Sequence, residues 1–401
     1  MPVIVGDGSG DSQMNGDGKG VSLGTTDTTG RDAGVSTATG TLIYNTSDNV
    51  VQVWSGSSWA QLSNDFSATG GTITDPGNGY RYHAFTTSGS FEVSGGGGKT
   101  IEVVVVGGGG GGGTNNNNGG SDGGAGGGGG GVVLASHTFD SGTYTVTVGT
   151  GGAGGTVNAP QPGNPINQQA GLCSPSKSAP YNGDSGNPGG DSVFGANSPT
   201  PLKLTAKGGG GGGSGPNAGN EDCGGSGGGA GSGGNPVTNG GPALQPAQNP
   251  SFAGTLTTNV GNAGGNAPGG PFRGGGGGGA GGAGNNGGNA GPGVGGPAIT
   301  LPADWTAPLI GVNPLNPISR QFAAGGGGGD GGPSFPGTVA PGGSGGGGAG
   351  ATQNVNATQG QANSGSGGGG GSGLNGSPEA TDPEGAGQPG GSGIVIVRYQ
   401  L

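Results

Sequence analysis

The residue types that carry most protein chemistry are scarce in this chain and lie far apart. The two histidines, His83 and His137, each lie in or beside a predicted strand, and neither has a second metal ligand at helical or hairpin spacing. The carboxylates Glu379, Asp382 and Glu384 fall in a glycine- and proline-rich stretch, where no pair can be assigned to hydrolytic chemistry. We therefore expect that the protein is not an enzyme and that it has no metal site and no cofactor.

Two short segments come close to binding motifs and depart from them at decisive positions. Gly98-Lys99-Thr100 resembles the end of a phosphate-binding loop, but Val93 stands where the first glycine belongs, and a strand follows. Segment 11–18 resembles the start of a calcium loop, but Gln13 occupies the third position and Ser22 replaces the bidentate glutamate. We interpret the first as a strand and the second as a solvated turn, with a weak cation site as the alternative.

Glycine dominates the composition. The chain has 119 glycines and 29 prolines among 401 residues, so 119/401, about 30 %, of it is glycine, while charged residues make up 8 %. Ordinary globular domains contain about 7 % glycine and about 25 % charged residues. The composition therefore excludes an ordinary enzyme core. The uninterrupted glycine runs exclude collagen, in which glycine occupies every third position.

Charge and hydropathy exclude further classes of protein. The 21 acidic and 10 basic residues give a net charge of −11, which leaves no basic patch for nucleic-acid phosphates. No stretch approaches the roughly 18 consecutive apolar residues of a membrane-spanning helix. The first residues lack the basic and apolar regions of a secretory signal. We expect a protein that binds no nucleic acid, is not inserted in a membrane and does not use a cleaved signal.

Runs of consecutive glycines predict the architecture of the second part of the chain. A polyglycine II rod is an extended helix with three residues per turn and a rise of about 3.1 Å per residue, and it makes no internal hydrogen bonds. Because glycine has no side chain, such rods can lie side by side and bond to one another in every direction. We predict a bundle of parallel and antiparallel rods, rather than flexible linkers, built on Gly107–Gly113, Gly126–Gly131, Gly208–Gly213, Gly274–Gly279, Gly325–Gly329, Gly345–Gly348 and Gly367–Gly371.

The segments between the runs can form loops at the rod ends, and some contain large side chains in a proline-rich setting. Rigid loops with an aromatic side chain suit recognition. An alternative is that Trp305 and Leu309 pack the edge of the bundle or a subunit interface. The candidate receptor contacts are Tyr181 in segment 158–185 and Trp305, Leu309 and Ile310 in segment 297–322.

The two cysteines, Cys173 and Cys223, both lie in loops that border glycine runs. Two cysteines do not make a disulfide framework. The sequence leaves two interpretations open, a bond across the tip of a rod or two free small residues.

Short β-rich runs precede the glycine-rich region, and another ends the chain. Residues 82–86 and 89–93 predict two strands around a turn, and the apolar run 103–106 predicts a strand buried on both faces. The final run, 393–400, is predicted to return beside the early strands. Residues 81–401 should therefore be all-β, a β-sandwich-like head plus a polyglycine II bundle with loops, with essentially no α-helix.

The first 80 residues divide into three predicted parts. Residues 1–35 are polar and aperiodic, which predicts an extended arm that needs a partner to be ordered. Residues 36–64 predict a small β-meander, and residues 65–80 a linker. About 25 residues cannot bury enough surface to be stable alone. We expect the meander to oligomerise or dock, and a plain surface hairpin is the alternative.

Two parts of the chain resemble proteins of tailed bacteriophages. The segment 40–59, with Gly40-Thr41-Leu42-Ile43-Tyr44-Asn45-Thr46 and a Trp54 to Trp59 turn, resembles a β-module of tail-fibre and other virion proteins. Residues 81–401 resemble the glycine-rich domain of marine-phage structural proteins, through pieces such as 103–109 and the ending 393–399. Phage adhesins with a polyglycine sandwich are an analogue by composition only.

The resemblance implies a virion fibre or appendage subunit. We expect a host-surface adhesin that uses the loops between its rods, with a head-decorating or purely structural virion fibre as the alternative and a cellular surface-matrix or filament protein as a further one. The expected partners are other virion proteins through the N-terminal arm, a host receptor (a glycan or an outer-membrane protein) and further copies in a homotrimer. Such a protein is assembled in the host cytoplasm and is extracellular, on the virion, after lysis.

Overall fold

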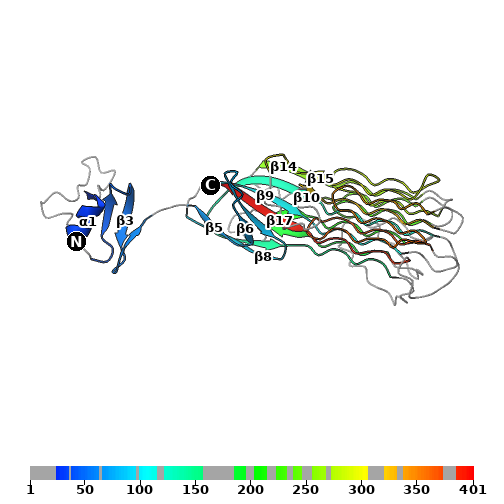
Figure 1. Ribbon diagram of the computed structural model, residues 1–401, viewed down its shortest axis with the longest axis horizontal. Helices are drawn as coiled ribbons and strands as arrows, with labels where there is room; N and C mark the ends of the chain where they lie inside the picture. Colours follow the sequence, from blue (N-terminus) through cyan, green and yellow to red (C-terminus); the bar gives the residue numbers. More distant parts are fainter. Residues whose placement is uncertain are drawn as a thin grey trace. The chain divides into compact units, whose positions relative to one another are not determined.

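In the computed structural model the chain forms two compact units. The smaller consists of residues 1–67 with 94–97, and the larger of residues 68–93 with 98–401 (Figure 1). The structure describes residues 24–35, 38–62, 66–95, 99–114, 122–156, 185–195, 203–214, 223–232, 238–245, 255–267, 272–305, 320–331, 337–373 and 385–401.

The smaller unit is a four-stranded sheet with one short helix beside it. Strand β1 (Thr25–Thr26) pairs parallel with β2 (Leu42–Asn45). Strands β2, β3 (Val50–Trp54) and β4 (Trp59–Gln61) form an antiparallel meander, as expected for this stretch.

The described part of the N-terminal arm is not extended. Helix α1 (Thr28–Gly34) begins at Asp27, whose carboxylate accepts a hydrogen bond from the amide of Gly30 at 2.6 Å. The expectation of an extended arm over residues 1–35 is therefore corrected for residues 24–35. A strand of two residues and a helix of seven are too short to produce a hydrophobic periodicity that can be recognised in the sequence, so neither element was predicted.

The larger unit begins with two sheets. The six-stranded sheet has the order β14-β10-β9-β17-β7-β6, and the five-stranded sheet the order β13-β12-β11-β8-β5. The last strand, β17, lies between β9 and β7, where the sequence predicted its return. The bounds are β5 (Ser67–Thr69), β6 (Thr72–Thr74), β7 (Tyr80–Phe85), β8 (Gly89–Ser94), β9 (Lys99–Val106), β10 (Val132–Phe139), β11 (Gly142–Thr147), β12 (Ser192–Phe194), β13 (Leu204–Ala206), β14 (Thr255–Val260) and β17 (Ile394–Gln400), with a separate hairpin of β15 (Ile299–Thr300) and β16 (Gln321–Phe322).

An aromatic cluster joins the two sheets. The ring of His83 on β7 lies edge-on to the ring of Phe91 on β8, with the centroids 5.1 Å apart. Burial lowers the pKa of His83, and its Nδ1 lies 2.7 Å from the carbonyl oxygen of Gly70. The apolar run of β9 is buried on both faces, as predicted. The other rings of the cluster belong to Phe139, Tyr144 and Phe194. The all-β fold class is confirmed.

The described part of the expected linker 65–80, residues 66–80, contributes strands to both sheets and is not a linker. Strand β5 is the edge of the five-stranded sheet, and β6 pairs with β7 at the edge of the six-stranded sheet. Between them, Gly70 and Gly71 have φ of 104° and 64°, and a Cβ at Gly70 would lie 2.1 Å from the carbonyl oxygen of Ser90. Glycine is required at this close crossing between the two sheets.

Beyond the sheets the chain continues as rods that bond to one another with a period of three residues (Figure 1). In rod 122–131, the amides of Gly124 and Gly127 both donate to rod 366–373 at 2.9 Å, and the intervening amides donate to other rods. This is the packing predicted for polyglycine II rods. The rod donates to three neighbours and accepts from three others, and these are 107–114, 207–214, 223–232, 272–279, 323–331 and 366–373.

The limits of the rods differ from those of the glycine runs. Gly345 and Gly346 have φ of 101° and 112° and form a turn, so the run Gly345–Gly348 does not form a rod over its whole length. Conversely, segments 238–245 and 261–267 are hydrogen-bonded as rods although neither contains a long glycine run. Ala125 and Ala230 are fully buried within rods, so the packing admits a methyl group at particular positions.

Candidate binding surface at the distal end of the rods

The rods run between the sheets and the opposite end of the bundle, which we call the distal end. Rod 107–114 follows β9 directly, and rod 122–131 runs antiparallel to it and leads into β10. Thr114 and Asp122 therefore both lie at the distal end. The same registers place a rod end there at Thr156, Ser185, Ser232, Thr238, Ala267, Phe272, Gly331, Gly337, Gly373 and Gly385.

A buried ion pair connects several rods at this end. The side chains of Arg273 and Asp330 are 6 % and 4 % exposed, and Arg273 Nε lies 2.9 Å from Asp330 Oδ1. Asp330 Oδ2 accepts from the amide of Thr338 at 3.2 Å, and its backbone oxygen accepts from the hydroxyl of Ser372 at 2.7 Å. Arg273 Nη1 also donates to two carbonyls of the turn 288–291. The pair thus fixes rods 272–279, 323–331, 337–343 and 366–373 relative to one another.

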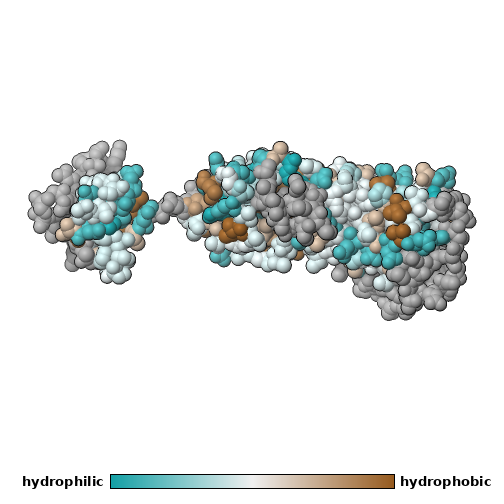
Figure 2. All heavy atoms as spheres, viewed as in Figure 1, coloured by the Kyte–Doolittle hydropathy of each residue, from teal (hydrophilic) through white to brown (hydrophobic). Residues whose placement is uncertain are grey.

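Three large apolar side chains are exposed at the distal end. Phe272, Val339 and Val355 are 39 %, 37 % and 47 % exposed. Phe272 and Val339 each adjoin in sequence a residue bonded to the Asp330 carboxylate, and Val355 closes a turn with Thr352. Figure 2 shows hydrophobic side chains among hydrophilic ones over the rods. The ion pair therefore positions the backbone that carries part of this apolar surface.

Asp122 is a buried carboxyl at the distal end. Asp122 is only 5 % exposed, and burial raises the pKa of its carboxyl to about 6. A carboxyl whose pKa is higher in the folded than in the unfolded state favours folding when it is protonated. Its contribution to stability is therefore lost as the pH rises from about 4, the unfolded pKa, through about 6.

Replacing Asp122 by asparagine should remove this pH dependence. We expect Asp122→Asn to raise the free energy of unfolding by about 2 kcal/mol near pH 7 and to change it little near pH 4. Urea unfolding at both pH values measures the difference, with Asp140→Asn, at an exposed position, as the control. Equal pH profiles for Asp122→Asn and the wild type would contradict the assignment.

Trp305 is not at the distal end and is not available to a receptor. It is 1 % exposed, and its ring lies 6.2 Å from the ring of Tyr82 on β7. The prediction of a receptor contact at Trp305 is therefore wrong, because the six-stranded sheet offers this large ring an apolar surface to bury against. The other candidate receptor contacts, Tyr181, Leu309 and Ile310, lie outside the described residues.

Arg398 fastens the Trp305 segment to the sheet. Its guanidinium lies 4.1 Å from the ring centroid of Trp305 and 4.5 Å from that of Tyr80. It donates to the backbone oxygen of Asp304 at 2.8 Å and pairs with Glu102 at 2.7 Å. Both described ends of segment 297–322 therefore belong to the sheet end of the bundle.

Cys223 begins rod 223–232 and is disulfide-bonded. Its described neighbours lie near the sheet end of the bundle, since a Cβ at Gly224 would contact the backbone of Gly209 and Gly210. Cys173 lies outside the described residues.

The described residues include neither a metal-ligand cluster nor a membrane-spanning helix. Within these ranges, no three His, Cys, Asp or Glu side chains are grouped so that they could bind a metal ion. The helix that they contain is too short and too polar to cross a membrane.

The fold and the distal surface define a class of protein in which a β-sheet head carries a bundle of glycine-rich rods. A family model described as a glycine-rich domain matches residues 86–400, which is most of the chain. The chain therefore belongs to this glycine-rich domain family. No curated protein matches it.

Proposed function

We propose that the protein is a subunit of a fibre or other appendage of a tailed-bacteriophage virion, and that it binds the host surface through the distal end of its rods. The observation that carries the proposal is the repeated return of the chain to one end of a hydrogen-bonded bundle. This arrangement brings side chains from distant parts of the sequence together on a rigid support. Loops on a rigid scaffold are frequent binding surfaces.

The virion assignment is supported by sequence resemblance. Segment 40–59 is similar to a β-module of tail-fibre and other virion proteins, and residues 81–401 are similar to the glycine-rich domain of marine-phage structural proteins. On this proposal the smaller unit faces other virion proteins and the larger unit faces the host. Assembly takes place in the host cytoplasm, and lysis releases the protein on the virion.

The distal side chains suit a neutral partner such as a glycan or a surface protein. The exposed ring of Phe272 offers a stacking surface, and the exposed amides of Asn289 and Asn354 can donate and accept hydrogen bonds. Among the described residues at the distal end, the positively charged side chain is that of Arg273, and it is paired with Asp330. It therefore does not favour an anionic partner.

Removing the exposed apolar side chains should weaken attachment. We expect the double variant Phe272→Ser, Val355→Ser of the full chain to bind candidate host cells about tenfold more weakly or worse, because buried aromatic contacts carry a large share of interface energy. Binding of fluorescently labelled protein to whole cells measures the effect. The matched control is Ile73→Ser, Leu256→Ser, which removes two equally exposed apolar side chains from the sheets.

The outcomes separate the candidate functions. Saturable binding that is lost in the distal variant and kept in the control supports an adhesin. Equal loss in both variants contradicts the assignment of the surface to the distal end. Absence of binding by the folded wild-type protein to every host tested favours the alternative of a head-decorating or structural virion fibre.

A further inference from the structure

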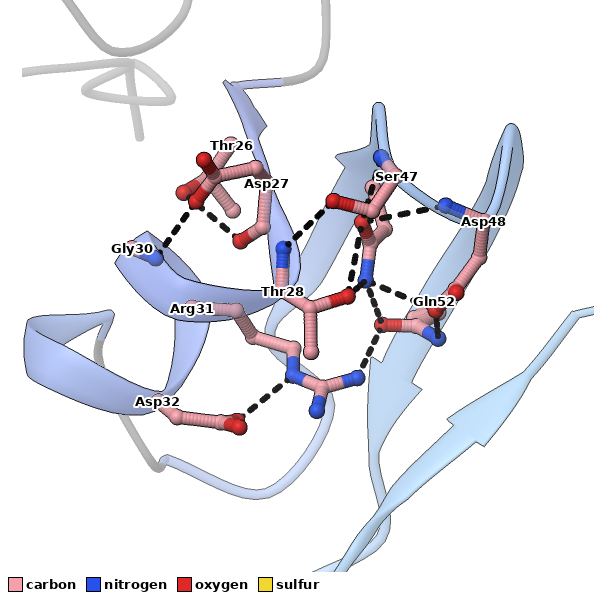
Figure 3. Close-up of polar contacts among 10 residues, drawn as sticks. Thr26, Asp27, Thr28, Gly30, Arg31, Asp32, Ser47, Asp48 and Gln52 are labelled. Atoms are coloured by element: carbon pink, nitrogen blue, oxygen red, sulfur yellow. Dashed lines mark hydrogen bonds and ion pairs between the residues drawn. The ribbon is translucent and has the colours of Figure 1, made fainter.

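The smaller unit has an inverted distribution of polar and apolar side chains. Asn45 is fully buried, and its amide nitrogen donates to Thr28 Oγ1 of α1 at 3.1 Å and to Asp48 Oδ2 at 2.9 Å. Gln52, 6 % exposed, accepts from Arg31 Nη1 of α1 at 2.9 Å (Figure 3). The sheet is therefore joined to α1 mainly by polar contacts.

Little apolar surface is buried within this unit. Among its described residues, Ile43 is the one buried hydrophobic side chain. Small domains are only marginally stable because they bury a smaller share of their surface than large ones, and oligomerisation is one way in which they gain further burial. The contacts among the described residues of this unit therefore leave its sheet with little apolar burial.

The opposite face of the same sheet is apolar and open. Residues that pair across antiparallel strands share a face, so Leu42 lies beside Val53, and Val53 beside Ala60. Leu42 and Leu62 are 42 % and 55 % exposed, and none of the face residues carries a charge. We call this surface the open face, and its residues are Leu42, Tyr44, Val51, Val53, Ala60 and Leu62.

We infer that the smaller unit is a self-association module in which the open face packs against the open face of another copy of this chain. Two identical faces can meet without charge repulsion because the face is uncharged. The contact would supply the apolar burial that the polar face under α1 does not. The inference concerns the smaller unit alone and stands independently of host binding by the rods.

The mass of the full-length protein in solution tests the inference. We expect sedimentation equilibrium to show an oligomer, and the double variant Leu42→Glu, Leu62→Glu to weaken its association at least about a hundredfold, because two charges would enter an apolar contact. The control Ile73→Glu, Leu256→Glu places the same charges on exposed positions of the larger unit and should leave the oligomer intact. A wild-type protein that stays monomeric, or an oligomer that survives the open-face variant, would overturn the inference.

A pair of single cysteines tests the contact without introducing charge into it. Ala60 and Gln61 are adjacent and exposed, and they lie on opposite faces of β4. With a short bis-maleimide, Ala60→Cys should form covalent dimers of the full chain much faster than Gln61→Cys, and the wild type sets the background from the native cysteines.

Other occupants of the open face give different results. A monomer in which Cys introduced at position 60 resists labelling would mean that another segment of the same chain covers the face. A monomer in which it labels freely would leave the face open to a different virion protein. Either result, or equal cross-linking at the two positions, contradicts self-association through this face.

Discussion

Replacing Gly127 by alanine should destabilise the larger unit by about 3 kcal/mol or more. A Cβ at this position would lie 2.2 Å from the carbonyl oxygen of Gly110, and the obstacle is backbone that cannot rotate away. Relief requires rods 107–114 and 122–131 to separate, which stretches the bonds that the amides of Gly110 and Gly113 donate to Gly128 and Ala125, both 2.8 Å long. Overpacking costs about 1–3 kcal/mol, and each unsatisfied buried backbone group adds about 1–3 kcal/mol.

The matched control is Gly89→Ala in β8. A Cβ there would meet only the ring of Phe85, at 3.9 Å, which is ordinary contact. We expect this variant to be neutral or slightly stabilising, since alanine reduces the freedom of the unfolded chain. Urea unfolding of both variants gives the comparison. A Gly127→Ala protein as stable as Gly89→Ala would show that the central rods can move apart freely.

The central rods could be predicted from the sequence because each of them needs glycine at successive positions of its own segment. A rod with neighbours on all sides leaves little room for a side chain, so it appears in the sequence as a run such as Gly126–Gly131. A rod at the edge of the bundle, such as 238–245, is not surrounded by hydrogen-bonded rods among the described residues. Its free sides have room for the side chains of Pro, Ala and Leu. Edge rods therefore carry no glycine run to identify them.

The features that the sequence did not predict depend on distant partners. Strands β5 and β6 contain mostly serine, threonine and alanine, and their pairing is decided by β8 and β7. Arg273 and Asp330 are 57 residues apart, and nothing near either residue indicates the other. For Trp305, the sequence left open whether the ring contacts a receptor or packs against the bundle, because the choice depends on the distant Tyr82 and Arg398. The distal surface could be predicted as a set of loops but not as a set of neighbouring side chains.

Replacing Asp330 by asparagine should loosen the distal end by about 3–5 kcal/mol, because it leaves the guanidinium of Arg273 buried without its counter-charge. Removing both charges, as in Arg273→Met, Asp330→Asn, should cost less than the sum of the two single variants, since neither charge is then left unpaired. Urea unfolding of the four proteins completes the double-mutant cycle.

The same variant separates positioning from direct contact at the binding surface. Asp330 is 3 % exposed and cannot itself reach a receptor, but its carboxylate fixes the backbone beside Phe272 and Val339. Asp330→Asn should therefore raise amide exchange at Thr338 and weaken attachment to host cells, and the double variant should recover part of both. If attachment is unchanged while exchange rises, the apolar side chains next to the ion pair do not form the receptor contact, and the binding surface must lie on other rods of the distal end.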